Sequence, residues 1–361
     1  MAVPLFDTET PLAPLRPRLH AALAAVLDSG RFILGPEVEG FEREFALAVG
    51  VEQAVGVANG TDALTIALRA LGVGPGDEVI VPSFTFYASA EAIPPTGAVP
   101  VFCDIDLDTF CVTPETVRAA ATPRTKAVLA VDLFGNVAPV KEIRDELGLP
   151  VLEDAAQAAG ASLDGRPAGS LGDAATFSFF PSKNLPGFGD GGAIVTGDPA
   201  VAERARTLRF HGSRDKVTFA EVGYNSRLDE LQAALLRVVL PELASWAEGR
   251  RAAARAYVEA GLGDHVVLPT PTAGADPAWH LFVVRHPEAD ALAATLTAAR
   301  IGARAYYRRP LHEQPALRAY APRVALPATD EAARTHLALP MSPVLGPGQA
   351  AEVVAAVASR R

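Results

Sequence analysis

Short apolar runs alternate with amphipathic runs along the chain from about residue 54 onward. The runs that predict strands are Ala54–Ala58, Glu78–Val81, Val99–Cys103, Ala127–Val131 and Pro150–Leu152. Those that predict the intervening helices are Ala63–Leu71, Ala88–Ile93, Pro114–Ala120 and Val140–Leu147. Strands that are apolar on both faces and alternate with helices are typical of a parallel sheet covered on both sides, with right-handed crossovers. The pattern therefore predicts an α/β fold with a mainly parallel sheet in a three-layer domain.

The pattern changes after about residue 230. Leu231–Ala260 predicts a long helix interrupted at Pro241, and a proline-rich loop follows it. The remaining predictions are a strand at Trp279–Arg285 and helices at Glu288–Arg300 and Gly348–Ser359. A length of 361 residues also suits two domains. We expect a large α/β domain at 15–240, a smaller α+β C-terminal domain at 241–361, and an N-terminal arm at 1–14.

Composition excludes several classes of protein. The chain is 49% apolar and 20% charged, as globular proteins are. Its net charge of −10 leaves no surplus of cations for nucleic acid. The pairs Arg250–Arg251, Arg308–Arg309 and Arg360–Arg361 are isolated, so we expect them on the solvated surface. There is no apolar signal core at the N-terminus and no apolar run of ~18 residues, so we expect a soluble, cytoplasmic protein without a membrane partner.

The two cysteines, Cys103 and Cys111, predict neither a disulfide framework nor a metal site. They have no CxxC or Cys/His spacing, and the histidines are scattered. Both cysteines lie beside a predicted strand, where buried structural thiols are expected. We therefore expect no metal.

Candidate chemistry follows the strand ends, because ligands of open α/β sheets bind beyond the carboxyl ends of the strands. After the first strand, Asn59, Gly60, Thr61 and Asp62 open a helix. A glycine lets the backbone approach a phosphate, and the helix N-terminus and the Thr61 hydroxyl favour an anion. Helix capping by Asn59 or Thr61 would explain the same residues. After the second strand, Phe86 and its aromatic neighbours could stack on a flat ligand or simply pack in the core.

A carboxylate at the end of the fifth predicted strand needs a partner. Asp154 follows an apolar run, where an unpaired charge is costly. A ligand cation such as a protonated pyridine nitrogen would satisfy it, and Gln157 could reach a neighbouring ring oxygen. The alternative for Asp154 is a helix N-cap.

Lys183 ends a strand-like run and precedes a glycine-rich segment. Its apolar neighbours Phe179 and Phe180 disfavour the charged amine and so favour a nucleophile. Only four lysines occur in the chain, and arginine could not form a Schiff base. A surface lysine on a turn is the alternative. A phosphate cradle, an aromatic, an acid with glutamine three residues on, and a later lysine are together the parts that a pyridoxal phosphate enzyme needs.

With these motifs the sequence resembles a known family, the DegT/StrS-type sugar aminotransferases. Members of this family have the type I pyridoxal-phosphate-dependent transferase fold. The matching motifs are NGTDAL at 59–64, EDAAQA at 153–158, FSFFPSKN at 177–184 and GYNSRLDELQAA at 223–234. The resemblance runs from Ser29–Val38 to Tyr307–His312.

The resemblance implies roles for individual residues. Lys183 would be the Schiff-base lysine and proton shuttle, Asp154 the partner of the pyridine nitrogen, and Gln157 a donor to the ring hydroxyl. Phe86 would stack on the ring. The phosphate ligands implied are Gly60, Thr61, the Asp62 amide and Ser178. In the family an asparagine of the neighbouring subunit also reaches the phosphate, and Asn225 occupies that motif. A homodimer with shared active sites is therefore implied.

The resemblance also implies a reaction. L-Glutamate would give its amino group to the cofactor, and pyridoxamine phosphate would pass it to a nucleotide-diphospho-keto-sugar. HGSRDKV at 211–217 is similar to the branch that acts at carbon 3 of a dTDP-3-keto-6-deoxyhexose. Tyr306, Tyr307 and His312 are candidates for contacting the sugar nucleotide, with packing as the alternative.

Two alternatives remain open, and two others are disfavoured by the residues present. One is transfer to carbon 4 of a dTDP- or UDP-4-keto-sugar, and another is a pyridoxal-phosphate-binding regulatory protein. A sugar dehydratase of the same scaffold would need histidine in place of Lys183. A cysteine desulfurase would need a mobile reactive cysteine.

Overall fold

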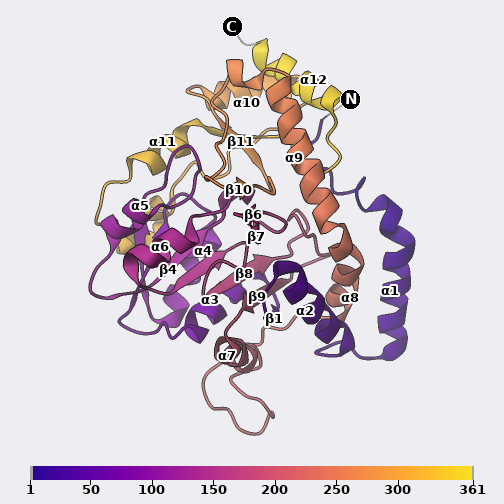
Figure 1. The fold of residues 1–361 in the computed structure, drawn as a ribbon, viewed down its shortest axis with the longest axis vertical. Helices are drawn as coiled ribbons and strands as arrows, with labels where there is room; N and C mark the ends of the chain where they lie inside the picture. Colours follow the sequence, from indigo (N-terminus) through magenta and orange to yellow (C-terminus); the bar gives the residue numbers. More distant parts are fainter. Residues whose placement is uncertain (1–2, 360–361) are drawn as a thin grey trace.

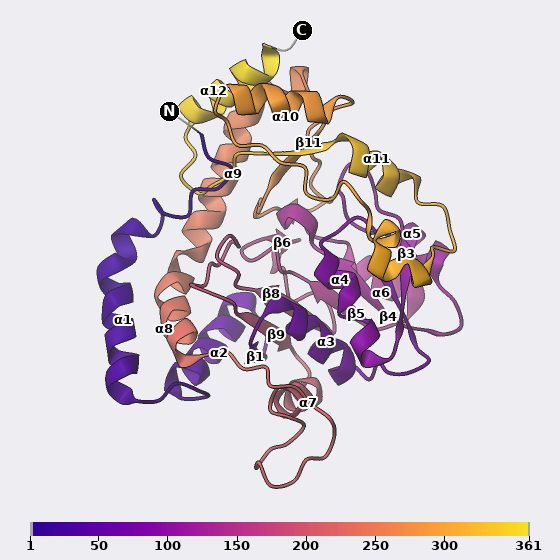
Figure 2. The same cartoon turned by 180° about the vertical axis from the view of Figure 1, so that it is seen from behind.

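A seven-stranded sheet with helices on both faces forms the centre of the molecule (Figures 1 and 2). The computed structural model describes residues 3–359. The strands are β1 (Gln53–Val57), β2 (Glu78–Pro82), β3 (Val99–Cys103), β4 (Thr125–Val131), β5 (Val151–Asp154), β8 (Ala174–Ser178) and β9 (Gly192–Thr196). Their order is β1-β9-β8-β5-β4-β2-β3. β9 runs antiparallel to β1 and β8, and the other neighbours are parallel. The prediction of a mainly parallel α/β sheet is confirmed.

The sheet separates two hydrophobic cores. The helices that surround it are α1 (Arg16–Ser29), α2 (Pro36–Val49), α3 (Gly60–Ala70), α4 (Tyr87–Glu91), α5 (Pro114–Ala120), α6 (Val140–Leu147), α7 (Pro199–Arg209) and α8 (Glu230–Val239). Along β4, Val128 and Ala130 join the core that contains α2 and α8. Ala127, Leu129 and Val131 join the core that contains α3 and α7. Because successive strand side chains point to opposite faces, this alternation accounts for strands that are apolar throughout.

A third core lies toward the C-terminus. It packs α9 (Leu243–Glu259), α10 (Ala289–Ala298) and α12 (Pro347–Ala358) on a two-stranded sheet of β11 (Phe282–Arg285) and β12 (His336–Leu339). A 3₁₀ turn at Leu240–Glu242 separates α8 from α9, as predicted from Pro241. The domain boundary near residue 240 stays a prediction.

The strand predicted at Trp279–Arg285 is shorter than expected. Trp279 has φ of +41°, a left-handed value that a strand does not use, and β11 begins only at Phe282. Residues 278–281 instead pack on a turn at Leu133–Gly135 (η3), where Ala278 N donates to Gly135 O and Leu281 N to Phe134 O. The remaining elements are α11 (Pro327–Thr335) and a small sheet of β6 (Ser162–Leu163), β7 (Arg166–Pro167) and β10 (Ala275–Asp276).

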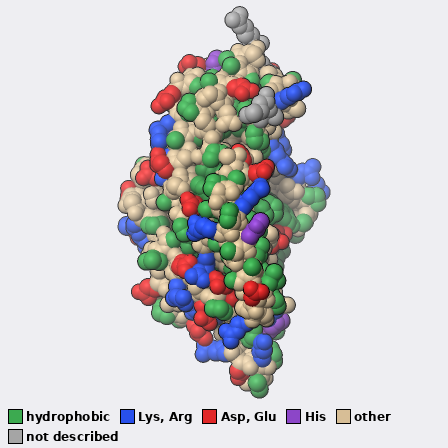
Figure 3. Space-filling view, turned by 90° about the vertical axis from the view of Figure 1, so that its right-hand side faces the viewer, with side chains coloured by type: hydrophobic (Ala, Val, Ile, Leu, Met, Phe, Trp, Pro, Cys, Tyr) green, Lys and Arg blue, Asp and Glu red, His purple; other side chains and the backbone are tan. Residues whose placement is uncertain are grey.

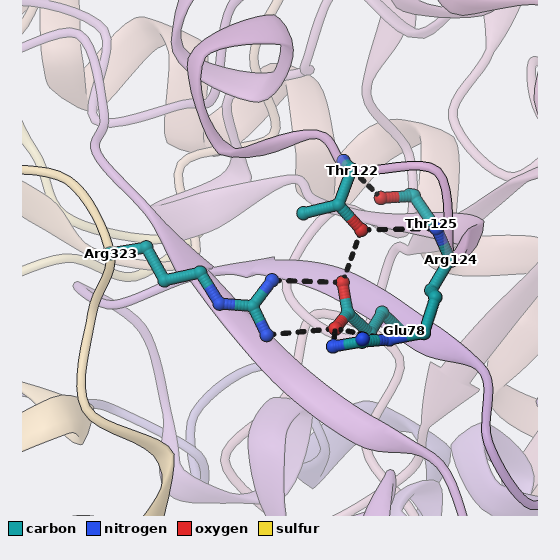
Figure 4. A network of polar contacts seen from close by, with 5 residues as sticks. All are labelled: Glu78, Thr122, Arg124, Thr125 and Arg323. Atoms are coloured by element: carbon teal, nitrogen blue, oxygen red, sulfur yellow. Dashed lines mark hydrogen bonds and ion pairs between the residues drawn. The ribbon is translucent and has the colours of Figure 1, made fainter.

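A buried carboxylate ties the start of β2 to the last part of the chain (Figure 4). Glu78 accepts from Arg323 Nη1 at 3.0 Å and Nη2 at 2.7 Å, from Arg124 Nε at 3.0 Å, and from Thr122 Oγ1 at 2.5 Å. These partners lower the pKa of Glu78 to about 2, with the Arg323 hydrogen bond as the main cause. The cluster lies at the end of the sheet opposite the carboxyl ends of β2 and β5.

The surface departs from expectation at one arginine. Arg250 was expected on the solvated surface but is buried, with its Nη1 donating to Trp279 O at 3.2 Å. Arg308 is partly exposed and pairs with Asp290, while Arg360–Arg361 lies outside the described residues. Acidic and basic side chains are interspersed on the side that carries α1 (Figure 3). Within residues 3–359 no helix is both long and apolar enough to cross a membrane. Cys103 and Cys111 are buried free thiols, as expected.

Candidate active site

A cavity of about 650 Å³ opens beyond the carboxyl ends of β5 and β8. Its walls come from the turn into α3, the turn into α4, the ends of β5 and β8, and two segments of the last third of the chain. Its lining includes Gly60, Thr61, Asp62, Phe86, Ser89, Asp154, Gln157, Ser178, Lys183, His280, Tyr306 and Tyr307. The sequence-predicted cofactor residues other than Asn225 are therefore brought together at one place.

The N-terminus of α3 forms one end of the cavity. Asn59 caps the helix, because its Oδ1 accepts from Asp62 N at 2.8 Å. The Asp62 amide, predicted as a phosphate ligand, is therefore already engaged in this cap. A Cβ at Gly60 would lie 2.8 Å from Ser178 Cβ, so only glycine allows the helix to approach the end of β8 this closely. The first amides of a helix have no carbonyl partner within it, and their dipole favours an anion.

Asp154 is the last residue of β5 and is buried. Its Oδ2 accepts from Ser89 Oγ at 2.8 Å, and its Oδ1 accepts from Ala156 N at 3.2 Å. Burial raises the pKa of Asp154, while these two hydrogen bonds and the charge of Lys183 oppose the rise. A cation in the cavity would therefore stabilise the carboxylate.

Lys183 lies in the turn that follows β8, where its backbone N donates to Phe180 O at 2.8 Å. Burial lowers the pKa of its amine to about 8, and Asp154 is the opposing influence. An amine of this kind is partly neutral near physiological pH, so it can attack a carbonyl carbon or accept a proton.

Gln157 presents a donor to the cavity. Its Oε1 accepts from Phe134 N at 2.8 Å, which assigns the oxygen to that side, because a backbone N–H can only donate. The Nε2 donates to Tyr307 Oη at 3.2 Å and has a second hydrogen for a ligand. Gln157 can therefore take the donor role that the resemblance implies, and that role stays a prediction.

The predicted substrate residues divide into two groups. Tyr306 and Tyr307 line the cavity, but His312 does not. The Nδ1 of His312 instead lies 2.7 Å from Ser83 Oγ, and Ser83 also accepts from the His312 backbone at 3.2 Å. His312, Glu313 and Asp330 form the one group within residues 3–359 whose ligand atoms lie close enough together to share a metal ion, and they lie at the protein surface.

Phe86 and Asn225 are exposed for different reasons. Phe86 lines the cavity and is 54% exposed, so one face of its ring is accessible to a flat ligand. Asn225 is exposed and outside the cavity, in a β-bridge with Phe210. Asn225 directly follows the loop 211–224, which extends below α7 in Figure 1.

Sequence reasoning missed His280 and Phe6. His280 is buried beside the cavity, its ring stacked on Phe6 with centroids 6.0 Å apart. Burial, followed by the charges of Lys183 and Arg250, lowers its pKa, so the ring is neutral. A single histidine inside a predicted strand carried no signal, and the positive φ of Trp279 that turns the backbone here cannot be read from composition.

The chain is similar to known proteins over nearly its whole length. The model of the DegT/DnrJ/EryC1/StrS aminotransferase family matches residues 15–358. A dTDP-3-amino-3,4,6-trideoxy-alpha-D-glucose transaminase of Streptomyces venezuelae is 48% identical, over 98% of this chain and 95% of the relative. A UDP-N-acetyl-3-dehydro-alpha-D-glucosamine 3-aminotransferase of Acidithiobacillus ferrooxidans is 43% identical, over 99% and 97%. The crystal structure of S. venezuelae DesV in complex with a ketimine intermediate has a TM-score of 0.95 and 47% identity, over 100% of this chain and 99% of that chain.

Proposed function

Because this chain belongs to the DegT/DnrJ/EryC1/StrS aminotransferase family, we propose that it transfers an amino group to carbon 3 of a nucleotide-linked keto-sugar. The names of both relatives specify an amino group at carbon 3, although one sugar carries dTDP and the other UDP. The higher identity of the dTDP-sugar relative favours a dTDP-3-keto-6-deoxyhexose as acceptor. The observation that carries the proposal is the Lys183 amine in one cavity with the buried Asp154 carboxylate.

The residues of the cavity fit pyridoxal phosphate. The α3 N-terminus, closed against Ser178 by Gly60, suits the phosphate. The buried Asp154 suits a protonated ring nitrogen, and the exposed Phe86 suits the face of the ring. When bound, the cofactor supplies an aldehyde and an electron-withdrawing ring, and its pyridoxamine phosphate form carries the amino group between the two substrates.

Lys183 has two tasks in this proposal. Its neutral amine is the group that bonds to the cofactor aldehyde, and burial supplies that neutral form. Once released by an incoming amine, which we take to be L-glutamate, the Lys183 amine would accept the proton from the substrate α-carbon. It would then deliver that proton to the former aldehyde carbon, on the other side of the substrate nitrogen.

Asp154 and Gln157 would hold the ring in place around Lys183. The Asp154 carboxylate, which Ser89 orients through the 2.8 Å hydrogen bond, would keep the ring nitrogen protonated. Gln157 would donate its free Nε2 hydrogen to the ring hydroxyl, because Phe134 N holds the Oε1 on the other side. Tyr306 and Tyr307 would then face the sugar nucleotide across the remaining space.

A homodimer with shared active sites is part of the proposal. The loop 211–224 leaves Val217 82%, Phe219 60% and Val222 84% exposed, and apolar side chains grouped in this way are typical of an interaction surface. Contact of this loop with a second subunit would cover them and would bring Asn225 to the partner's phosphate site.

The direct test separates donor and acceptor. The purified protein should absorb visible light, and L-glutamate should bleach that absorption and release 2-oxoglutarate. Mass spectrometry of products from a panel of dTDP- and UDP-linked 3-keto and 4-keto sugars then identifies the acceptor. Products aminated only at carbon 4, or no half-reaction with any amino acid, would each overturn the proposal.

A further inference from the structure

A pair of buried carboxyl groups lies on the face of β5 opposite Asp154. Asp132 follows β4 and Glu153 precedes Asp154 on β5, and both are 0% exposed. Successive residues of a strand point to opposite faces, so Glu153 faces away from Asp154. Ala130 pairs with Glu153 across β4 and β5, so Asp132, two residues after Ala130, points to the same face as Glu153. A hydrogen bond between the two side chains is among the influences on both of their pKa values, and two ionised carboxylates cannot form one.

The backbone donors around the pair are unequal. Glu153 Oε1 accepts from Gly169 N at 2.6 Å, and its Oε2 accepts from Leu171 N at 3.1 Å and Gly172 N at 3.2 Å. Asp132 has one such donor, Ala138 N, at 2.9 Å from its Oδ1. The other oxygen of Asp132, Oδ2, is buried and accepts no hydrogen bond. Three amides favour a charged Glu153, and a proton on Asp132 Oδ2 would give that oxygen a role as donor.

Asp132 also shapes a loop that touches Gln157. Its backbone N donates to Asp154 O at 3.1 Å, and its Oδ1 closes the loop 132–138 through Ala138 N. Inside this loop Phe134 adopts a left-handed φ of +60°, which is strained for a bulky residue and must be held by its surroundings. That backbone turns Phe134 N toward Gln157 Oε1.

From these contacts we infer that Asp132 is protonated in the folded protein, donates to the charged Glu153, and positions the loop that orients Gln157. The carboxyl pair then carries one negative charge instead of two beside Asp154. Asp132 is a positioning residue, since it does not line the cavity and acts through Phe134 N. The inference about Gln157 rests on the proposed function, whereas the protonation of Asp132 does not.

The groups around Asp132 favour its neutral form. Burial is the largest cause of the raised pKa of Asp132, followed by the charge of Glu153. Asp154, which lies next to Glu153 on β5, also raises the pKa of Asp132. On the side of the loop before α5, the neighbouring titratable group is the buried thiol of Cys111. Ala138 N is the one influence among these that opposes protonation.

Asp132→Asn tests the protonation in the full-length holoenzyme. Asparagine keeps an acceptor for Ala138 N and a donor for Glu153, and it cannot ionise. Above pH ~4, Asp132 of the unfolded wild type loses its proton, whereas Asp132 of the folded wild type keeps it. The unfolding equilibrium constant of the wild type, divided by that of Asp132→Asn, should therefore rise by about tenfold per pH unit. Urea unfolding at a series of pH values, at one protein concentration, measures this ratio. Infrared spectra should also lose the C=O band of a protonated carboxyl group in Asp132→Asn.

Asp104→Asn is the matched control. Asp104 follows β3 as Asp132 follows β4, and it also holds a loop, accepting from Ala328 N at 3.0 Å and Thr329 N at 2.7 Å, but it is partly exposed. For Asp104→Asn, the ratio of the wild-type and variant unfolding constants should not rise with pH, and the infrared band of the protonated carboxyl group should remain. If the ratio of unfolding constants for Asp132→Asn does not change with pH, or if its infrared spectrum equals that of the wild type, the inference that Asp132 is protonated is wrong.

A double-mutant cycle tests the link to Gln157. Asp132→Ala removes both hydrogen bonds and should weaken pyridoxal phosphate binding about tenfold in equilibrium dialysis, whereas Asp132→Asn should stay within about twofold. In a Gln157→Ala background, Asp132→Ala should cause no further loss. Additive losses would overturn the positioning role. If Asp132→Ala fails to fold, weakened binding in Asp132→Asn would overturn it. These outcomes do not depend on which substrate the enzyme uses.

Discussion

Lys183 shows how far a single residue can be interpreted from its neighbours. The sequence places it after an apolar run that ends in two phenylalanines, and that environment predicts an amine with a lowered pKa. The structure gives the same direction and a value of about 8. By contrast, the orientation of Gln157 depends on Phe134 N and Tyr307 Oη, which are far away in sequence. No local pattern encodes such contacts, and His280 escaped prediction for the same reason.

The pKa of Lys183 predicts how the apoprotein captures its cofactor. The neutral amine is the reactive form, so the rate of pyridoxal phosphate capture should rise about tenfold per pH unit below pH 8 and then level off. An ordinary lysine would show its break roughly two pH units higher. Stopped-flow absorbance measures the rate, and Lys183→Arg, which keeps the cation, should capture none. A break near the ordinary lysine pKa would show that the amine is not desolvated.

At the scale of elements, hydrophobic periodicity predicts most strands of the large sheet and most of the helices that cover it. α5 and α6 begin and end where the pattern places them. The antiparallel direction of β9 could not be predicted, because a strand buried on both faces has the same apolar pattern in either direction. The late start of β11 comes from packing of residues 278–281 on η3, a tertiary contact that overrides local propensity.

The cap of α3 serves both the helix and the ligand, and substitutions can separate the two. Asn59→Ala should lower the free energy of unfolding by about 1 kcal/mol, because Asp62 N loses its acceptor. Asn59→Asp keeps an acceptor but places a charge beside the bound phosphate. We expect wild-type stability for Asn59→Asp and at least a tenfold weaker affinity for pyridoxal phosphate, measured by dialysis. Unchanged affinity would place the phosphate elsewhere.

The Glu78 cluster makes the attachment of the last third of the chain depend on pH. The folded pKa of Glu78, about 2, is lower than its ordinary value of 4.5, so its stabilisation is full above pH ~5 and is lost as pH falls toward 2. Glu78→Gln should cost roughly 2–3 kcal/mol at neutral pH and little at pH 2. Urea unfolding at both pH values measures the difference. As a control, Glu115→Gln, at an exposed helix start, should have a much smaller effect. An equal cost at both pH values would argue against an ionised Glu78.

At the scale of the whole molecule, Asn225 lies apart from the other predicted cofactor residues. The cavity holds the lysine, the acid and the helix N-terminus, while Asn225 stays outside it on an exposed loop. From the sequence alone, Asn225 could be assigned only through the resemblance to the family, because a contact between subunits leaves no periodic pattern. The exposed apolar side chains of the same loop supply an independent physical reason to expect a partner surface there.

Shared active sites predict complementation between two inactive variants. Lys183→Ala removes the reactive amine of a subunit's own site, and Asn225→Asp would repel the phosphate in the partner's site. Each variant alone should lose nearly all turnover. After co-expression, a heterodimer contains one site with both defects and one with neither, so it should recover about half of the wild-type rate per dimer. The matched pair Lys183→Ala with Asp154→Ala places both defects within the subunit's own site and should recover nothing. Because the two pairs differ only in which subunit supplies the second residue, equal recovery in both, or none in either, would contradict an Asn225 that crosses the interface.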